Sequence, residues 1–170
     1  MKTPIIKAKD LTLRPITLSD AQGYLECHKD KEAQKNFSHC PKNLKEAREE
    51  IKKDSTRESR TWVIEVNGEF AGFIHLRGTN VPRYKHSSIM GYGLHPKFRG
   101  RGLATKATKL VTSYGFNKLK LVRIAAMCRS YNQASARVLE KAGYKLEGIM
   151  KKNKFKDGKY LDDMIWAKVK

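Results

Sequence analysis

The sequence predicts one α/β domain, residues 1–170, built on a mixed and mostly antiparallel sheet of about seven strands with about four helices. The first observation is the length, because 170 residues suit a single hydrophobic core. The second is the composition, with 39% hydrophobic and 9% aromatic residues and no repeat or low-complexity linker. The third is that strand-like and helix-like patterns follow one another along the chain.

The amino-terminal part is expected to contain one strand and two helices. Residues 11–16 alternate in polarity like a strand, and Pro15 places this strand near an edge of the sheet or marks its end. Ser19 and Asp20 can cap a first helix that runs to about residue 29. Asn43 can cap a second helix, whose apolar residues recur near helical spacing.

A β-hairpin is expected in the middle of the chain. Asn67 and Gly68 separate two apolar runs, residues 61–66 and 69–76. This dipeptide between apolar runs favours a two-residue turn, because both turn positions need φ > 0. Residues 87–94 form the next expected strand.

The carboxyl-terminal part is expected to alternate between helices and strands. Gly143 marks a helix end, and Asp157-Gly158 joins the strands of a last hairpin. The expected elements are a helix over 103–117, a strand over 119–128, a helix over 132–142, and strands over 144–155 and 160–169.

The composition argues against membrane, secreted and metal-binding proteins. No apolar run approaches the roughly 18 residues of a membrane span, and no apolar stretch of a signal peptide follows the first basic residues. A cytoplasmic protein without a membrane partner is therefore expected. The chain has three cysteines, Cys27, Cys40 and Cys128, and none of them forms a CxxC pair. Neither a disulfide framework nor a metal site is therefore expected.

The whole chain has a net charge of +19, and the positive charge is concentrated in its second part. Residues 97–170 contain 19 Lys and Arg against 5 Asp and Glu, and no acidic residue lies between Glu69 and Glu140. A solvated surface normally mixes both signs, so this section favours an anionic partner. A generally basic proteome would give the same excess, and this alternative stays open.

A glycine-rich loop, Lys97-Phe-Arg-Gly-Arg-Gly102, lies between an expected strand and an expected helix. Glycines let the backbone approach a ligand, and the first N–H groups of a helix point outward at the positive end of its dipole. Such a turn binds phosphate, and Arg99 and Arg101 add charge. The spacing excludes a Walker loop, and Thr105 and the lack of a later acid exclude a dinucleotide fingerprint.

This loop resembles the acetyl-CoA pyrophosphate motif of GNAT acetyltransferases, Gln/Arg-x-x-Gly-x-Gly/Ala. Lys97 stands in the first position, a departure that keeps the charge. Further similar segments are Asn132-Gln-Ala-Ser135, Val138-Leu-Glu-Lys-Ala-Gly-Tyr144, Lys156-Asp-Gly-Lys-Tyr-Leu-Asp162, residues 11–16 and the hairpin at Asn67-Gly68. Together they cover nearly the whole chain and resemble the branch that contains ribosomal-protein-alanine N-acetyltransferases.

The resemblance implies a single GNAT-like domain with a central splay, where the strand at 87–94 separates from the strand at 120–128. Acetyl-CoA would be the acetyl donor, with its pantetheine arm hydrogen bonded to the strand on one side and to Asn132 on the other. Asn132 also stands where a helix N-cap belongs, and the two roles can coexist. The residues expected to bind the cofactor are Gly93, Leu94, Lys97, Arg99, Gly100, Arg101, Gly102, Leu103, Ala104, Asn132 and Ser135.

Ser135 resembles the serine that this branch places near the thioester sulfur, so it is expected to protonate the departing thiolate, directly or through water. A local hydrogen bond of a helix serine is the alternative. The glutamate that many relatives carry on the strand before the loop is absent, because Ile89 and Met90 stand there. Candidates for the base are Tyr92, His75, His28 and Asp162, and Tyr92 is taken together with Ser135 as catalytic.

The missing acid favours an acceptor that loses its proton easily, such as the N-terminal α-amine of a protein, in particular an acidic or ribosomal one. Polyamines are cations and suit a +19 chain without a visible acidic cluster poorly. Acetylation of a small amine such as an antibiotic remains a rival. A non-catalytic ribosome- or nucleic-acid-binding module is another, based on the basic run 151–156. The sequence is compatible with a monomer or a homodimer, and with RNA contact through the ribosome.

Overall fold

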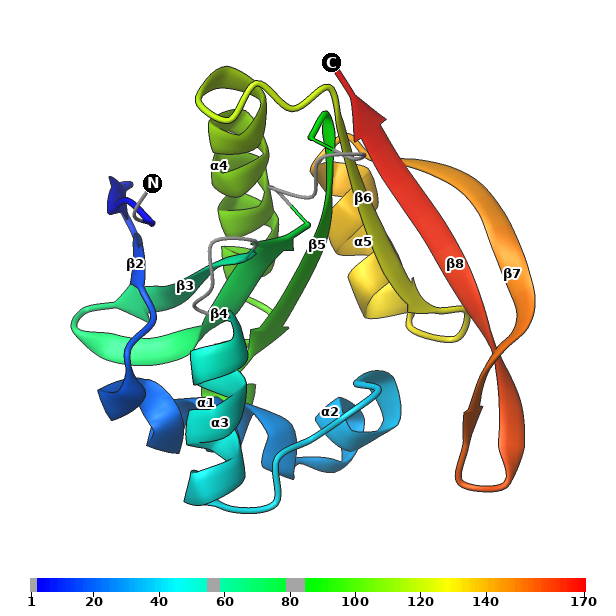
Figure 1. Cartoon of the computed structure of the whole chain (residues 1–170), viewed down its shortest axis with the longest axis horizontal. Coiled ribbons are helices and arrows are strands. Elements are labelled where there is room, and N and C mark those ends of the chain that lie inside the picture. The colour runs from blue at the N-terminus through cyan, green and yellow to red at the C-terminus, as the bar shows by residue number, and fades with distance from the viewer. Residues whose placement is uncertain (1–2, 55–58, 79–84) are drawn as a thin grey trace.

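The computed structural model describes residues 3–54, 59–78 and 85–170, and its strands join into one sheet. The eight described strands lie in the order β1-β2-β3-β4-β5-β6-β8-β7, and β5 pairs with β6 in parallel (Figure 1). The strands are β1 (Ile6–Lys7), β2 (Thr12–Pro15), β3 (Ser59–Val66), β4 (Glu69–Arg77), β5 (Ser87–Leu94), β6 (Arg123–Arg129), β7 (Lys145–Lys156) and β8 (Lys159–Val169). The α-helices are α1 (Ala21–Lys29), α2 (Lys31–Asn36), α3 (Leu44–Asp54), α4 (Leu103–Asn117) and α5 (Gln133–Lys141), with short 3₁₀ turns η1 (Leu18–Asp20) and η3 (Pro96–Phe98).

Helices cover both faces of the sheet. Val111 of α4 and Leu139 of α5 join the larger core cluster, which includes Trp62 of β3. The next residue of the same strand, Val63, belongs to a second cluster with Ile51 of α3. Successive residues of a strand point to opposite faces, so α4 and α5 lie on one face of the sheet and α1 and α3 on the other (Figure 1).

The parallel pair β5–β6 opens partway along its length. Its register runs from Ser87↔Arg123 to Met90↔Ala126, while the following residues of β5 continue to pair with β4. No described residue of β6 pairs with the end of β5 from Gly91 onward. The expected central splay is therefore confirmed.

Local turn chemistry agrees with the sequence. Asn67 and Gly68 have φ of 51° and 79°, as a two-residue hairpin turn with two positive φ angles requires. The side chain of Asn43 accepts a hydrogen bond from the Glu46 N–H at 3.0 Å and so caps α3. The helix expected at 103–117 and the strand expected at 87–94 have the observed bounds of α4 and β5.

The differences have local causes. The six-residue α2 was not expected, because its sequence KEAQKN has no apolar periodicity; Asp30 caps it by accepting from the N–H groups of Glu32 and Ala33. The two-residue β1 is too short to produce a pattern. The strand expected from residue 119 starts at Arg123, since Lys120 adopts a φ of 59°.

Asp20 does not cap the first helix as expected. Its carboxylate accepts hydrogen bonds from the Arg14 guanidinium at 2.7 and 2.9 Å and from the Thr17 N–H at 2.8 Å. It therefore joins β2 to the turn before α1.

None of the described helices combines the length and the apolar character needed to cross a membrane. Cys27, Cys40 and Cys128 are free thiols, the first and last of them buried.

Candidate active site

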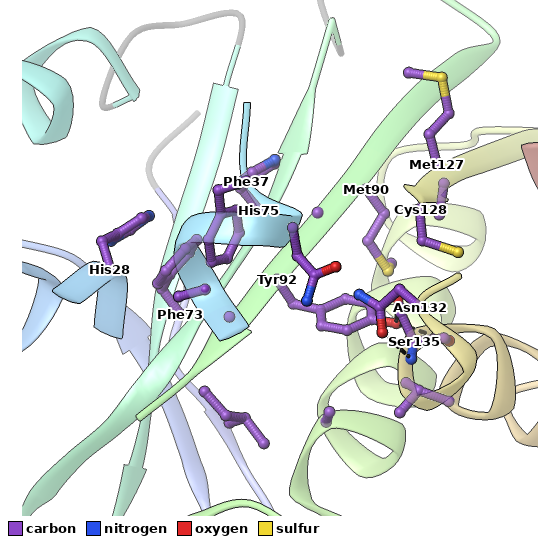
Figure 2. Close-up of a pocket in the computed structure, with 18 of the residues that line it drawn as sticks. His28, Phe37, Phe73, His75, Met90, Tyr92, Met127, Cys128, Asn132 and Ser135 are labelled. Atoms are coloured by element: carbon purple, nitrogen blue, oxygen red, sulfur yellow. Dashed lines mark hydrogen bonds between the residues drawn. The ribbon is translucent and has the colours of Figure 1, made fainter. Parts of the chain in front are cut away.

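A cleft of about 1510 Å³ passes through the sheet where β5 and β6 separate. Its lining therefore comes from both faces of the sheet. Figure 2 shows His28, Phe37, Phe73 and His75 on one side of β5, and Tyr92, Cys128, Asn132 and Ser135 on the other. One opening thus joins two half-sites, which are here called the donor side (next to α4 and α5) and the acceptor side (next to α1 and α2).

The donor side ends at the glycine-rich loop. Gly100 and Gly102 have φ of 75° and 74°, and an added Cβ would meet nothing within 4 Å at either position. Backbone conformation, and not crowding, is therefore what favours glycine here. Gly102 is the N-cap of α4, and the first helical bond runs from Lys106 N–H to Gly102 O. The N–H groups of Leu103 and Ala104 are left for an anion at the helix N-terminus.

The basic residues of the loop differ in their availability. Arg99 lines the cleft, but its guanidinium donates to both carboxylate oxygens of Asp30 at 2.6 and 3.1 Å, and its Nε donates to Leu94 O at 3.2 Å. These bonds lower the pKa of Asp30. Lys97 pairs with Glu69, and Arg101 lies 5.7 Å from the centroid of the Phe98 ring. Lys97 and Arg101 lie outside the lining of the cleft, so within this loop the start of α4 is the main anion-binding feature.

The free edge of β5 presents backbone groups to the cleft. His95 N–H donates to Ala71 O at 2.9 Å, and the same pairing with β4 continues through Gly93. In an antiparallel pair the N–H groups that face the partner recur at every second residue, so Gly93 N–H points toward β4. Leu94 and Tyr92 N–H then point toward the edge that β6 leaves. Leu94 and Tyr92 are therefore positioned to hydrogen bond an extended ligand, whereas Gly93, which was also expected to do so, directs its N–H to β4.

Three expected residues come together on the donor side. The Asn132 side chain accepts from Ser135 N–H at 3.0 Å, which is the expected N-cap of α5. The cap occupies its oxygen, and its Nδ2 has no acceptor within the described ranges, so the amide can still donate to a ligand. Tyr92 Oη lies 2.9 Å from Ser135 Oγ and 3.3 Å from Ser135 O. Burial raises the pKa of Tyr92, which keeps its hydroxyl protonated at neutral pH.

The acceptor side is aromatic. An added Cβ at Gly93 would lie 2.8 Å from ring atoms of both Phe37 and Phe73, so the two rings lie directly over the strand. His28 packs against both rings and its Nδ1 lies 2.8 Å from Tyr24 O. Burial lowers the pKa of His28.

His75 is the second histidine of the acceptor side. Burial, followed by the Arg77 charge, lowers the pKa of His75 to about 3. Like His28, it is therefore a neutral group at neutral pH.

Charged groups lie farther out along the cleft. Its lining includes eight Lys or Arg and five Asp or Glu, an excess of positive charge. The acidic residues of the lining include four glutamates from α2 and α3: Glu32, Glu46, Glu49 and Glu50. Asp162 lies outside the lining, where it accepts from Lys151 Nζ at 2.9 Å and Lys152 N–H at 2.8 Å.

Sequence reasoning missed the buried pair Arg129–Asp163, whose N–O distance is 2.6 Å. Arg129 also donates to Ser38 at 3.1 Å, and Asn153 donates to Asp163 at 2.8 Å. The pair thus ties β6, β7 and β8 to the loop after α2 and fixes one wall of the cleft. The partners are 34 residues apart, and no local pattern signals their contact.

This arrangement can hold a long thioester donor with its phosphates at α4, its arm along β5 and its acyl group at the opening between the two sides. These features define a coenzyme A-dependent acyltransferase of the GNAT fold. Residues 10–145 match the acetyltransferase (GNAT) domain, and the chain belongs to this family of N-acetyltransferases, which use acetyl-CoA.

Relatives and solved structures agree with the family. The uncharacterized N-acetyltransferase YoaA of Bacillus subtilis (strain 168) is 30% identical over 98% of this chain and 97% of its own. The spermidine N(1)-acetyltransferase of Escherichia coli (strain K12) is 33% identical over 59% of this chain and 53% of its own. The structure of RimL, a ribosomal L7/L12 alpha-N-protein acetyltransferase in complex with coenzyme A, is similar with a TM-score of 0.87, 21% identity and 98% coverage of both chains.

Proposed function

We propose that the chain transfers the acetyl group of acetyl-CoA to the N-terminal α-amine of a protein or peptide. One observation carries this proposal. Where β5 meets the cleft, the acceptor side presents the rings of Phe37 and Phe73 and the neutral histidines His28 and His75, and no described residue of β4 or β5 in the lining carries a carboxylate. Such a site offers weak proton acceptors and apolar surface.

The pKa of the acceptor amine decides whether a lysine side chain or an N-terminal α-amine is the better substrate. Deprotonating a lysine side chain at pH 7 costs about 4.6 kcal/mol, from a pKa of ~10.4 and ~1.36 kcal/mol per unit. An α-amine with a pKa of ~7.7–8.0 costs about 1 kcal/mol. A site with weak bases can therefore use an α-amine, whereas a lysine side chain would stay mostly protonated there.

The donor side would carry the rest of the reaction. The pyrophosphate would lie at the N–H groups of Leu103 and Ala104, and Leu94 N–H would donate to the thioester oxygen as negative charge develops on it. Ser135 would donate its proton to the leaving sulfur, with Tyr92 at 2.9 Å orienting the hydroxyl. The amine attacks directly, so no acetylated form of the enzyme is required.

The charge of the chain favours an acidic acceptor. The excess of positive charge along the cleft attracts acidic residues near the acceptor amine, and salt would weaken this attraction. RimL, whose fold is similar, is described as acting on a ribosomal protein α-amine. A cytoplasmic ribosomal protein is the acceptor that fits both points.

A second candidate acceptor is a polyamine. The four glutamates of α2 and α3 that line the cleft could bind an extended cation, and a relative of 33% identity is a spermidine N(1)-acetyltransferase. The lysines and arginines that outnumber these carboxylates along the cleft oppose such a ligand.

A competition panel tests the proposal. Purified protein and labelled acetyl-CoA would be given peptides with free N-termini and acidic, neutral or basic second to fifth residues, together with spermidine and an aminoglycoside. We expect the acidic peptides to react fastest at low ionic strength, and their advantage over basic peptides to shrink as salt is added. Spermidine or the aminoglycoside reacting faster than every peptide would overturn the α-amine assignment, and a salt-independent preference would overturn the charge assignment.

A further inference from the structure

We infer that His75 is the general base of the acetyl transfer, accepting through its Nε2 the proton that the attacking amine loses. This inference rests on transfer to an amine, which the family establishes, and not on which amine is used. An experiment that contradicts the α-amine proposal therefore leaves this inference unaffected, and the reverse also holds.

The first support is the place of His75 in the sheet. His75 of β4 pairs with Gly91 of β5, and Gly91 directly follows Met90, the last residue of β5 that pairs with β6. His75 thus lies beside the point where the sheet opens and where a thioester along the free edge of β5 would be reached from the acceptor side.

The second support is the direction of the imidazole. A Cβ added at Gly91 would lie 2.5 Å from His75 Nε2 and 2.7 Å from Cε1. The end of the ring therefore lies over the backbone of β5, in the space that a side chain at position 91 would occupy. His75 also lines the cleft, so its ring borders the space that an attacking amine would enter.

The third support is an unsatisfied polar atom. His75 Nδ1 is buried and has no hydrogen-bond partner in the part of the chain that the structure describes. It is one of eight such side-chain atoms among the described residues, and it is the one that belongs to an imidazole at the opening of the sheet, where a catalytic role can account for it. His28 differs, because its Nδ1 is bonded to Tyr24 O and its ring is packed among three aromatic residues.

The electrostatic surroundings agree with a neutral His75. Among the described residues, the other titratable groups of the acceptor side are Arg77 on β4, Tyr24 and His28 on α1, Glu32 on α2, Glu46, Glu49, Glu50 and Lys53 on α3, and His39 and Lys42 before it. Burial, with a smaller contribution from Arg77, holds the pKa of His75 at about 3. A group this weakly basic does not deprotonate a free ammonium ion. It suits an amine that arrives neutral and becomes acidic once its nitrogen has bonded to the carbonyl carbon.

The protons balance as follows. The neutral amine bonds to the thioester carbon, and the resulting cationic nitrogen gives one proton to His75 Nε2. The carbon–sulfur bond then breaks, and the thiolate receives one proton from Ser135. The histidinium then returns its proton through water to the Ser135 alkoxide, so one amide and one thiol are formed and the enzyme is unchanged.

His75→Ala and His75→Gln test the inference, with His86→Ala as a matched control on an exposed histidine outside the cleft. The readouts are kcat with an Ala-initiated peptide amide, or with the fastest amine of the panel, and the Kd of acetyl-CoA. We expect about 10²-fold lower kcat in both His75 variants, in the usual range for proton transfer by a side chain. Acetyl-CoA Kd should stay within about twofold.

Imidazole rescue separates a base from a structural residue. Added imidazole should raise kcat of His75→Ala in proportion to its concentration, and should leave His75→Gln unchanged because the glutamine fills the space. Activity within about threefold of the parent, or no rescue of His75→Ala, would overturn the inference.

Gly91→Ala gives an independent test that keeps the histidine. The new Cβ would displace the ring from β5, so kcat should fall while acetyl-CoA still binds. A fully active Gly91→Ala protein would contradict the assigned position of Nε2.

Discussion

Two substitutions at Gly102 separate the effect of backbone strain on stability from the effect of negative charge on acetyl-CoA binding. The Gly102 φ of 74° disfavours any side chain, and the open space around it means that a new Cβ causes no clash. Gly102→Ala should therefore cost only about 1–2 kcal/mol of stability for a left-handed conformation. Gly102→Asp adds a carboxylate at the start of α4, beside the groups that would hold the pyrophosphate.

The charge effect can be estimated from distance. Two like charges about 5 Å apart at an effective dielectric constant of about 20 repel by about 3 kcal/mol. This corresponds to roughly 100-fold weaker binding of acetyl-CoA. Gly102→Ala should bind within a few-fold of the parent, because it changes no charge.

Isothermal titration of both variants with acetyl-CoA measures the difference, and thermal unfolding with and without ligand checks that each variant is folded. At one ligand concentration, acetyl-CoA should raise the Tm of the parent and of Gly102→Ala clearly more than that of Gly102→Asp. Equal affinity of folded Gly102→Asp and Gly102→Ala would show that the pyrophosphate lies elsewhere.

Two further predictions concern catalysis and stability. Ser135→Ala should lower kcat by about 10²-fold with little change in acetyl-CoA Kd, while Ser113→Ala on the exposed face of α4 should have no effect; a full-speed Ser135→Ala in steady-state assays would assign sulfur protonation to water. Because burial lowers the pKa values of His28 and His75, the folded chain binds fewer protons than the unfolded chain below a pH of about 6.5. The free energy of unfolding in urea should therefore decrease from pH 7 to pH 5, and His28→Gln should make this slope smaller; an unchanged slope in His28→Gln would contradict a neutral buried His28.

The parts of this protein that the sequence predicts are those with local causes. Asn67-Gly68 and the loop glycines could be recognised because each residue type matches a positive φ in its own turn. The N-cap formed by Asn132 was likewise predicted from residue type and position. The splay was predicted from the resemblance to a family.

The remaining features depend on contacts between distant segments. Asp30 occupies the guanidinium of Arg99 across 69 residues, so the charge of the loop could not be read from its sequence. The approach of His75 to Gly91 depends on the register of β4 and β5. Four glutamates of α2 and α3 line the cleft, although they are spread over residues 32–50 in a chain whose net charge is +19.

The site of acetylation on one peptide tests the central claim most directly. A peptide with a free N-terminus, acidic second and third residues and one internal lysine would be incubated with the protein and acetyl-CoA. Tandem mass spectrometry would then locate the acetyl group, with an N-terminally blocked peptide as the control. We predict acetylation of the α-amine alone and no reaction of the blocked peptide, whereas acetyl-lysine in either peptide at a comparable rate would contradict the assignment.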